Sequence, residues 1–256
     1  MIRKKTGREI ELMRKAGKIA AAARLEAGKM VAVGATTISI NKKLHDFIIS
    51  RGATPAFLNY NGYPASVCIS INEQVIHGIP SSRQLIDGDV VSIDVGVMKD
   101  GFIGDCAATF IAGSSSPESI RLIDVTKQCF YEGIKYARVG YRISDISKAI
   151  QQHAEKNGYA VVRDYVGHGV GSKVHEPPEV PNFIEMPRKK ADPRLLPGMT
   201  LAIEPMVNSG AADISLLDDG WTVVTRDGML SAHYENTVLI TDGDPEILTV
   251  SEDEQL

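Results

Sequence analysis

Four acidic residues stand inside segments whose other side chains are typical of buried β-strands, and they constrain the fold more than any other feature. The four are Asp94 in VVSIDVGV, Asp105 in FIGDCAATF, Glu204 in TLAIEPMV and Glu235 in AHYENTVLI. Strand interiors disfavour Asp and Glu, and an unpaired buried carboxylate costs several kcal/mol. An edge strand or an ion pair could explain one such acid, but these segments contain no Lys or Arg. We therefore expect bound cations to compensate the charge.

The dipeptide Asp100-Gly101 indicates a two-residue hairpin turn between two of these segments. That turn sets Asp94 opposite Ala107, and Asp105 lies on the same strand face as Ala107. Asp94 and Asp105 then share one face of the sheet as diagonal neighbours, provided that no β-bulge shifts the register. We expect the two carboxylates to reach a common ion.

Four of the six histidines lie outside the expected helices. His77 lies in NEQVIHGIP before a Gly-x-Pro turn, and His168 lies in GHGVG, whose glycines let the backbone approach a ligand. His175 follows in VHEPP, and His233 stands two residues before the last acid, on the same expected strand face. A lone histidine in such a place is usually satisfied by hydrogen bonds, and GHGVG could be a tight turn. Their significance comes from the neighbouring acids.

The expected ligand set contains two Asp, two Glu and one His, and it is hard and rich in oxygen. Such a set favours Mn, Fe or Co and argues against a structural zinc site built on cysteine. Four carboxylates around a single ion would leave excess negative charge. Two divalent ions that share bridging carboxylates and a hydroxide balance this charge better.

The remaining pattern predicts two similar halves, about 1–113 and 114–256, each with two helices followed by strands. The first half has expected helices at 7–29 and 37–51 and strands at 66–72, 89–97 and 102–113. The second has helices at about 116–137 and 144–158 and strands at 159–166, 199–207, 221–225 and 229–241. His45 and His153 lie on these helices among polar residues and are interpreted as surface or structural. We expect an α+β fold in a single domain over 1–256, with 181–198 as a surface loop.

Composition argues against several classes of protein. The formal net charge is −4 and the charges are interspersed, which argues against a nucleic-acid binder. No apolar stretch typical of a signal peptide follows the basic start, and the apolar runs are too short for a membrane span. The three cysteines are sparse and odd in number, so we interpret them as reduced thiols. We expect a cytoplasmic protein without a nucleic-acid or membrane partner.

Five separated segments together resemble a known family. NEQVIHGIP, SIDVGVMKDGFIGDC, GHGVGSKVHEPP, PGMTLAIEPMV and SAHYENT, in this order, are similar to methionine aminopeptidases of type I in their short bacterial form. The resemblance covers nearly the whole chain. It implies the pita-bread fold, a curved antiparallel sheet with outer helices and a pseudo-twofold relation between the halves. It also implies removal of the N-terminal initiator methionine from nascent polypeptides when the second residue is small.

The resemblance implies a metal role for five residues. Asp94 would chelate the first of two divalent ions, and Asp105 and Glu235 would bridge both ions. His168 and Glu204 would complete the ligands of the second ion. The ions expected from the family are Co, Mn or Fe, with Zn and Ni as further candidates.

The resemblance also implies substrate contacts. His77 and His175 would contact the substrate backbone and stabilise the developing oxyanion, and Glu204 would accept a proton from a metal-bridging water that acts as the nucleophile. The residues that correspond to the family's methionine pocket are Tyr63, Cys68 and Trp221, with Tyr60 nearby. Taken alone, each of these four could equally be a core residue.

Three positions depart from the family pattern. Val174 stands where some members have Phe, and His233 and Asn236 flank Glu235 where the family has Gln and His. None of the three belongs to the implied metal set. Val174 would widen the entrance to the site.

Two other functions fit the same fold. A proline-specific peptidase would use the same five ligands but usually carries a large extra N-terminal domain, whereas this chain begins at the first expected helix. A non-catalytic peptide-binding module would typically have lost ligands, and all five are present. For the main hypothesis the partners are peptides with an N-terminal Met and, transiently, the ribosome, and we expect a monomer.

Overall fold

Helices form where the sequence predicts them. The computed structural model describes residues 2–184 and 192–251, and within these it has four α-helices: α1 (Gly7–Met30), α2 (Thr37–Ser50), α3 (Pro117–Ile134) and α4 (Ile143–Lys156). The side chains of Thr6, Thr36 and Ser116 cap the first three by accepting hydrogen bonds from backbone N–H groups of the first turn. None of the helices in the described ranges is long and apolar enough to cross a membrane.

The strands form one large antiparallel sheet and two small ones. The large sheet has the order β1-β4-β5-β14-β9-β7-β8, with β2 paired to β4 and β15 to β14. Its strands are β1 (Thr54–Pro55), β2 (Cys68–Ile71), β4 (Val90–Lys99), β5 (Phe102–Ile111), β7 (Gly167–Gly169), β8 (Glu176–Val180), β9 (Thr200–Ile203), β14 (Glu235–Leu239) and β15 (Glu246–Ile247). The small sheets are β13-β10-β6 and β11-β12-β3. Their strands are β3 (Gln74–Ile76), β6 (Ala160–Val161), β10 (Met206–Asn208), β11 (Ile214–Leu216), β12 (Val223–Thr225) and β13 (Ser231–His233).

The predicted hairpin register is confirmed. Strands β4 and β5 pair without a bulge, Asp94 lies opposite Ala107, and Asp105 lies opposite Gly96. Asp100 and Gly101 both have positive φ, at 51° and 81°, as a tight turn matched to the twist of the hairpin requires.

Two strands that the sequence predicts as continuous are broken at the same place, so those predictions were wrong. The segment 199–207 divides into β9 and β10 around Pro205, and 229–241 divides into β13 and β14 at Tyr234. Proline has no N–H for the ladder, and the N–H of Tyr234 donates to the Pro205 carbonyl over 3.2 Å. The chain therefore turns from the large sheet into the β13-β10-β6 sheet just beside Glu204 and Glu235.

The prediction was also wrong around the GHGVG motif. Of the expected strand 159–166 only Ala160–Val161 is strand, whereas His168 lies on β7, a strand that was not predicted. A Cβ at Gly167 would meet the Ala202 carbonyl oxygen at 2.5 Å, and one at Gly169 would meet that of Pro177 at 2.4 Å. The glycines thus let neighbouring strands, not a ligand, approach His168 from both sides. Of the expected loop 181–198, residues 185–191 lie outside the described residues.

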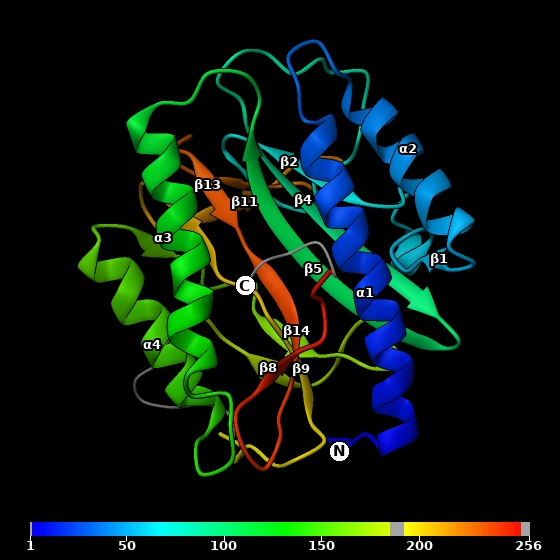
Figure 1. The fold of residues 1–256 in the computed structure, drawn as a ribbon. Helices are drawn as coiled ribbons and strands as arrows, with labels where there is room; N and C mark the ends of the chain where they lie inside the picture. Colours follow the sequence, from blue (N-terminus) through cyan, green and yellow to red (C-terminus); the bar gives the residue numbers. More distant parts are fainter. Residues whose placement is uncertain (1, 185–191, 252–256) are drawn as a thin grey trace.

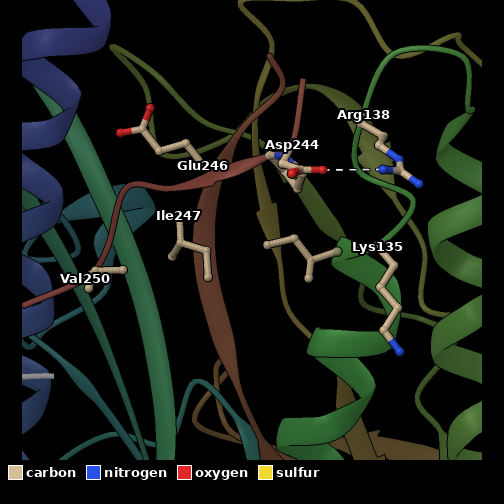
Figure 2. Close-up of a pocket in the computed structure, with 8 residues that line it drawn as sticks. Lys135, Arg138, Asp244, Glu246, Ile247 and Val250 are labelled. Atoms are coloured by element: carbon tan, nitrogen blue, oxygen red, sulfur yellow. Dashed lines mark hydrogen bonds and ion pairs between the residues drawn. The ribbon is translucent and has the colours of Figure 1, made fainter. Parts of the chain in front are cut away.

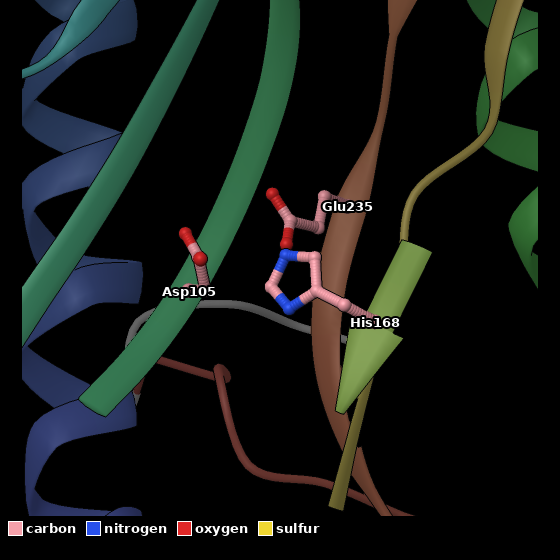
Figure 3. Close-up of side chains that lie close together, drawn as sticks. All are labelled: Asp105, His168 and Glu235. Atoms are coloured by element: carbon pink, nitrogen blue, oxygen red, sulfur yellow. The ribbon is translucent and has the colours of Figure 1, made fainter. Parts of the chain in front are cut away.

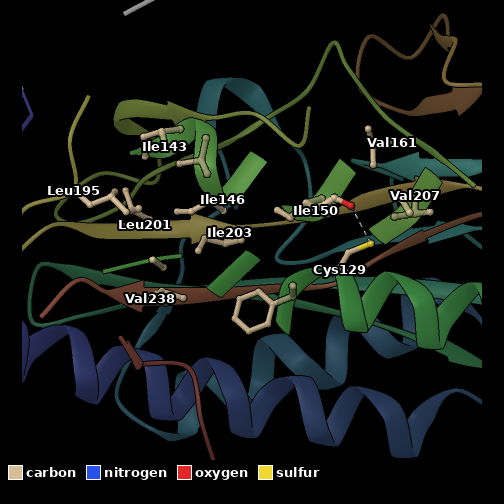
Figure 4. Packing of buried hydrophobic residues seen from close by; sticks show 14 of the residues in the cluster. Cys129, Ile143, Ile146, Ile150, Val161, Leu195, Leu201, Ile203, Val207 and Val238 are labelled. Atoms are coloured by element: carbon tan, nitrogen blue, oxygen red, sulfur yellow. Dashed lines mark hydrogen bonds between the residues drawn. The ribbon is translucent and has the colours of Figure 1, made fainter. Parts of the chain in front are cut away.

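Each pair of helices covers its own part of the sheet (Figure 1). Helices α1 and α2 pack on β2, β4 and β5, where the buried residues include Ile40, Leu44 and Ile93. Helices α3 and α4 pack on β9, β10, β13 and β14 around Ile146 and Ile150 (Figure 4). The α+β class with an antiparallel sheet and outer helices is confirmed.

One buried arginine joins α1 to the strand behind it. Arg24, only 3% exposed, donates through Nη1 to the backbone oxygen of Glu235 over 3.1 Å and to Oδ1 of Asn236 over 2.8 Å. Its Nη2 donates to the Thr249 carbonyl over 3.4 Å. The guanidinium therefore ties three segments together at the back of Glu235.

We predict that Arg24→Leu lowers the free energy of unfolding by about 2–3 kcal/mol, because it leaves buried oxygens without their charged donor. Chemical denaturation measures this change. The matched control is Lys15→Leu on the exposed side of α1, which should change the stability by no more than about 0.5 kcal/mol. Equal stability of the two variants would contradict the structural role of Arg24.

Candidate metal centre

The order of strands in the large sheet brings five side chains to one place. Asp94 lies on β4, Asp105 on β5, Glu235 at the start of β14, Glu204 directly after β9 and His168 on β7. These five strands are consecutive neighbours in the sheet. One donor atom each of Asp105, His168 and Glu235 lies within 4.8 Å of the others, and all three residues are buried (Figure 3).

A small residue separates the first and last of these carboxylates. Ala107 on β5 pairs with Asp94 on one side and with Glu235 on the other. Its methyl group leaves open the space in front of the sheet that a larger side chain would fill. Between Asp94 and Glu235, β5 therefore contributes only the methyl group of Ala107.

His168 is fixed in the tautomer that a metal ligand needs. Its Nδ1 lies 2.9 Å from the Gly169 carbonyl oxygen, and because a carbonyl can only accept, Nδ1 carries the proton. Its Nε2 therefore presents a lone pair, 3.4 Å from Oε1 of Glu204. Two lone pairs facing each other at this distance are stabilised by a cation between them.

Three carboxylates of the site each have one oxygen that no described residue satisfies. Among the described residues, Asp94 Oδ1, Asp105 Oδ1 and Glu235 Oε1 are buried without a hydrogen bond. Burial raises the pKa of Asp94 to about 7 and that of Glu204 to about 8. Burial, reinforced by the other carboxylates, also raises the pKa of Asp105 and Glu235 well above the usual range. This donor set fits divalent cations, which would satisfy the orphaned oxygens and the charge together.

Two of the expected substrate histidines lie at the edge of this centre. The ring of His175 lies 4.2 Å from that of His168, and its Nδ1 lies 2.8 Å from the hydroxyl of Tyr60. His77 has a φ of +59°, a conformation uncommon for a residue other than glycine. Burial, with the nearby His233 and His175, lowers the pKa of His77 to about 4, so it is neutral at pH 7.

The four expected pocket residues belong to one apolar cluster beside the carboxylates. Tyr63 and Cys68 are buried, and Tyr60 and Trp221 pack against them. The rings of Tyr63 and Trp221 meet edge to face at 5.1 Å, and Tyr63 Oη donates to the Gly78 carbonyl over 2.9 Å. Cys68 pairs with Asp94 across β2 and β4, so the apolar cluster directly adjoins the acids.

The structure also shows neighbours that sequence reasoning missed. Asn182 donates to the backbone oxygen of Glu204 over 3.0 Å, and Tyr165 packs edge to face on His77 at 5.5 Å. Neither carries a local signal in the sequence, because both contacts join distant segments. His233 and Glu235 belong to different strands, contrary to the expectation, yet His233 Nε2 still lies 3.6 Å from Glu204 Oε2.

A separate cavity lies on the outer face of the molecule. It has a volume of about 690 Å³ and lies between the end of α3 and β15 (Figure 2). An ion pair between Arg138 and Asp244, 3.4 Å apart, lies on its wall. None of the metal-centre residues lines it.

We predict that Mn²⁺ raises the melting temperature and that the increase is larger at about pH 7.5 than at about pH 6, because the ion must displace protons from carboxyls whose pKa is raised. In the metal-free protein the stability itself falls as the pH rises. The raised pKa values of Asp94 and Glu204 stabilise the fold at low pH, and this contribution is lost as the pH rises from the ordinary carboxyl pKa of about 4 to about 7 to 8.

Scanning calorimetry with and without Mn²⁺ measures both effects. Glu235→Gln is the control variant and should show no increase on adding the ion. An increase in wild-type melting temperature that is the same at both pH values would contradict the coupling between protons and metal.

The chain is similar to known metallopeptidases. The model of metallopeptidase family M24 matches residues 11–242. The methionine aminopeptidase of Clostridium perfringens is 54% identical over 98% of this chain and 99% of its own length. That of Escherichia coli is 43% identical over 98% of this chain and 95% of its own.

Solved structures give the same result. The methionine aminopeptidase of Rickettsia prowazekii has a TM-score of 0.94 at 43% identity. The match covers 98% of this chain and 100% of the Rickettsia chain. The prolidase of Pyrococcus furiosus has a TM-score of 0.79 at 23% identity, and the match covers 97% of this chain and 66% of the prolidase chain. It shares the fold alone. These neighbours confirm the pita-bread architecture. With a family match over most of its length, the chain belongs to metallopeptidase family M24.

Proposed function

We propose that this chain is a metal-dependent aminopeptidase that removes the initiator methionine of newly made polypeptides when the second residue is small. The observation that carries the proposal is the buried group of Asp105, His168 and Glu235, whose donor atoms lie within 4.8 Å. An apolar cluster that contains Tyr63 and Cys68 adjoins it. The names of relatives 43% to 54% identical over nearly the full length support the same function.

Five residues would hold two divalent ions. Asp94 would bind the first ion. His168 and Glu204 would bind the second ion. The carboxylates of Asp105 and Glu235 would be shared by both ions. The oxygen-rich set favours Mn, Fe or Co, with Zn and Ni as further candidates. When bound, such ions polarise a carbonyl group and make water a nucleophile at neutral pH.

The chain's own residues would orient the substrate and move the proton. Glu204 would accept a proton from the attacking water, because its carboxylate lies in the centre, 3.4 Å from Nε2 of His168. Because Tyr60 engages Nδ1 of His175, the other ring nitrogen is left to contact a substrate carbonyl. His77, neutral at pH 7, would contact the substrate backbone from the opposite side. These contacts crowd the scissile bond and leave little room for a long second side chain.

The methionine side chain would lie in the apolar cluster. The hydroxyl of Tyr63 is tied to Gly78, so its ring offers a fixed wall beside Cys68 and Trp221. A slot of this kind discriminates by size, and one methylene is worth about 1–3 kcal/mol. Val174, buried in the same cluster, would relax the second-residue rule slightly compared with a Phe.

We further propose that residues 1–256 act as one catalytic domain. The first half would supply Asp94 and Asp105, and the second half His168, Glu204 and Glu235, so neither half would hold both ions alone. The expected setting is the cytoplasm, with the enzyme as a monomer that associates transiently with the ribosome.

Three tripeptides test the proposed activity. With Mn²⁺ or Co²⁺, Met-Ala-Ser should be hydrolysed, and Ala-Pro-Ala and Met-Lys-Ser should be poor substrates, because the slot accepts methionine and the crowded site rejects a long second residue. Chromatography of the released amino acid measures the rates, and the chelated protein is the control. Preferential cleavage before proline would favour a proline-specific peptidase, and no hydrolysis by metal-filled protein would favour a binding module.

A histidine variant separates chemistry from metal binding. His175→Ala should lower kcat by about 10²–10³, the range observed when one oxyanion donor is removed. Its metal content should stay normal, since His175 is assigned to the substrate. His153→Ala on α4 is the matched control and should be as active as the wild type. Loss of metal from His175→Ala would show that the assignment of the histidines is wrong.

A further inference from the structure

The side chain of His233 ends inside the metal centre with an unsatisfied nitrogen. The residue is 2% exposed, and its Nε2 is buried with no hydrogen-bond partner in the part of the chain that the structure describes. That nitrogen lies 3.6 Å from Oε2 of Glu204. A buried nitrogen of this kind is costly unless it acquires a partner, so the position calls for a physical explanation.

The backbone holds His233 firmly in this place. Its N–H donates to Thr109 Oγ1 over 2.9 Å, and Thr109 Oγ1 donates to its carbonyl oxygen over 2.8 Å. The same hydroxyl lies 2.8 Å from Ser92 Oγ, which can donate to it, so the hydroxyl's donor and both acceptor positions are used. The ring of His233 therefore projects toward Glu204 from an anchored strand.

Two histidines flank the two oxygens of one carboxylate. His168 Nε2 lies 3.4 Å from Oε1 of Glu204, and His233 Nε2 lies 3.6 Å from Oε2. The proton of His168 is on Nδ1, so its Nε2 and Oε1 both offer lone pairs suited to one ion. Oε2 then remains as an acceptor, and His233 is placed to supply the donor.

We propose that the Nε2–H of His233 donates a hydrogen bond to Oε2 of Glu204 and thereby directs Oε1 toward the ion shared with His168. The inference rests on the proposed function in taking Glu204 as a metal ligand. The gap must shorten from 3.6 Å to about 3 Å, which a small rotation of either side chain achieves. His233 is then a positioning residue, since it acts on the metal through Glu204.

Two amide variants test the role of His233. The amide nitrogen of Gln reaches about as far as the Nε2 of His, whereas that of Asn is one methylene shorter. His233→Gln should bind Mn²⁺ within about threefold of the wild type, and His233→Asn about 10- to 100-fold more weakly, the usual cost of losing a partner of a metal ligand. Calorimetric titration measures the affinities, and the Co²⁺ absorption spectrum should change shape only in His233→Asn.

Equal, wild-type affinities of both variants would overturn the proposal. Equal weakening of both, with the same change in the Co²⁺ spectrum, would also overturn it, because it would make His233 a direct ligand. Melting of the metal-free variants shows that each is folded. Both titrations are made without substrate, so a wild-type chain that takes up no ion at all would refute the proposed function itself.

A measurement on the wild type tests the position of the proton directly. In protein labelled with ¹⁵N-histidine and loaded with Zn²⁺, long-range ¹H–¹⁵N NMR reports which ring nitrogen of His233 carries the proton, with His233→Gln used for assignment. A proton on Nε2 supports the proposal. A metal-bound or unprotonated Nε2 refutes it.

Discussion

The mutual repulsion of buried carboxylates is the constraint on which the rest of this structure depends. Asp94, Asp105, Glu204 and Glu235 lie on or directly after four neighbouring strands, and three of them have a buried oxygen without a partner among the described residues. Such an arrangement is costly for a fold that binds nothing, since burial and like charges both disfavour ionisation. Divalent ions attract the carboxylates that otherwise repel one another. An arrangement that destabilises the metal-free protein therefore becomes a binding site.

Neighbouring features of the chain serve the same centre. Ala107 leaves the space between two carboxylates open, and the glycines beside His168 let the adjacent strands close around it. Arg24 provides a permanent positive charge at the back of β14, where it holds the backbone of Glu235. In this arrangement Glu235 lies between the guanidinium of Arg24 behind the sheet and the proposed ions in front. His233 would support Glu204 as Arg24 supports Glu235.

Local signals were enough to predict the helices and the hairpin, because caps, turn residues and strand parity act over a few positions. The register of Asp94 and Asp105 followed from Asp100-Gly101 alone. The break at Pro205 had a local signal, because proline cannot donate to the ladder. The break at Tyr234 and the strand at His168 could not be predicted, since both depend on backbone pairing between segments far apart in the chain. For the same reason only family resemblance, not pattern, suggested the apolar pocket around Tyr63.

The central claim is that these acids hold two ions through shared carboxylates. Calorimetric titration of metal-free protein with Mn²⁺ or Co²⁺ tests it most directly, in the wild type and in Asp94→Ala and Glu235→Ala. The account predicts two binding events in the wild type, one in Asp94→Ala, and none in Glu235→Ala, because Glu235 is assigned to both ions. An unchanged number of bound ions in Glu235→Ala would contradict it.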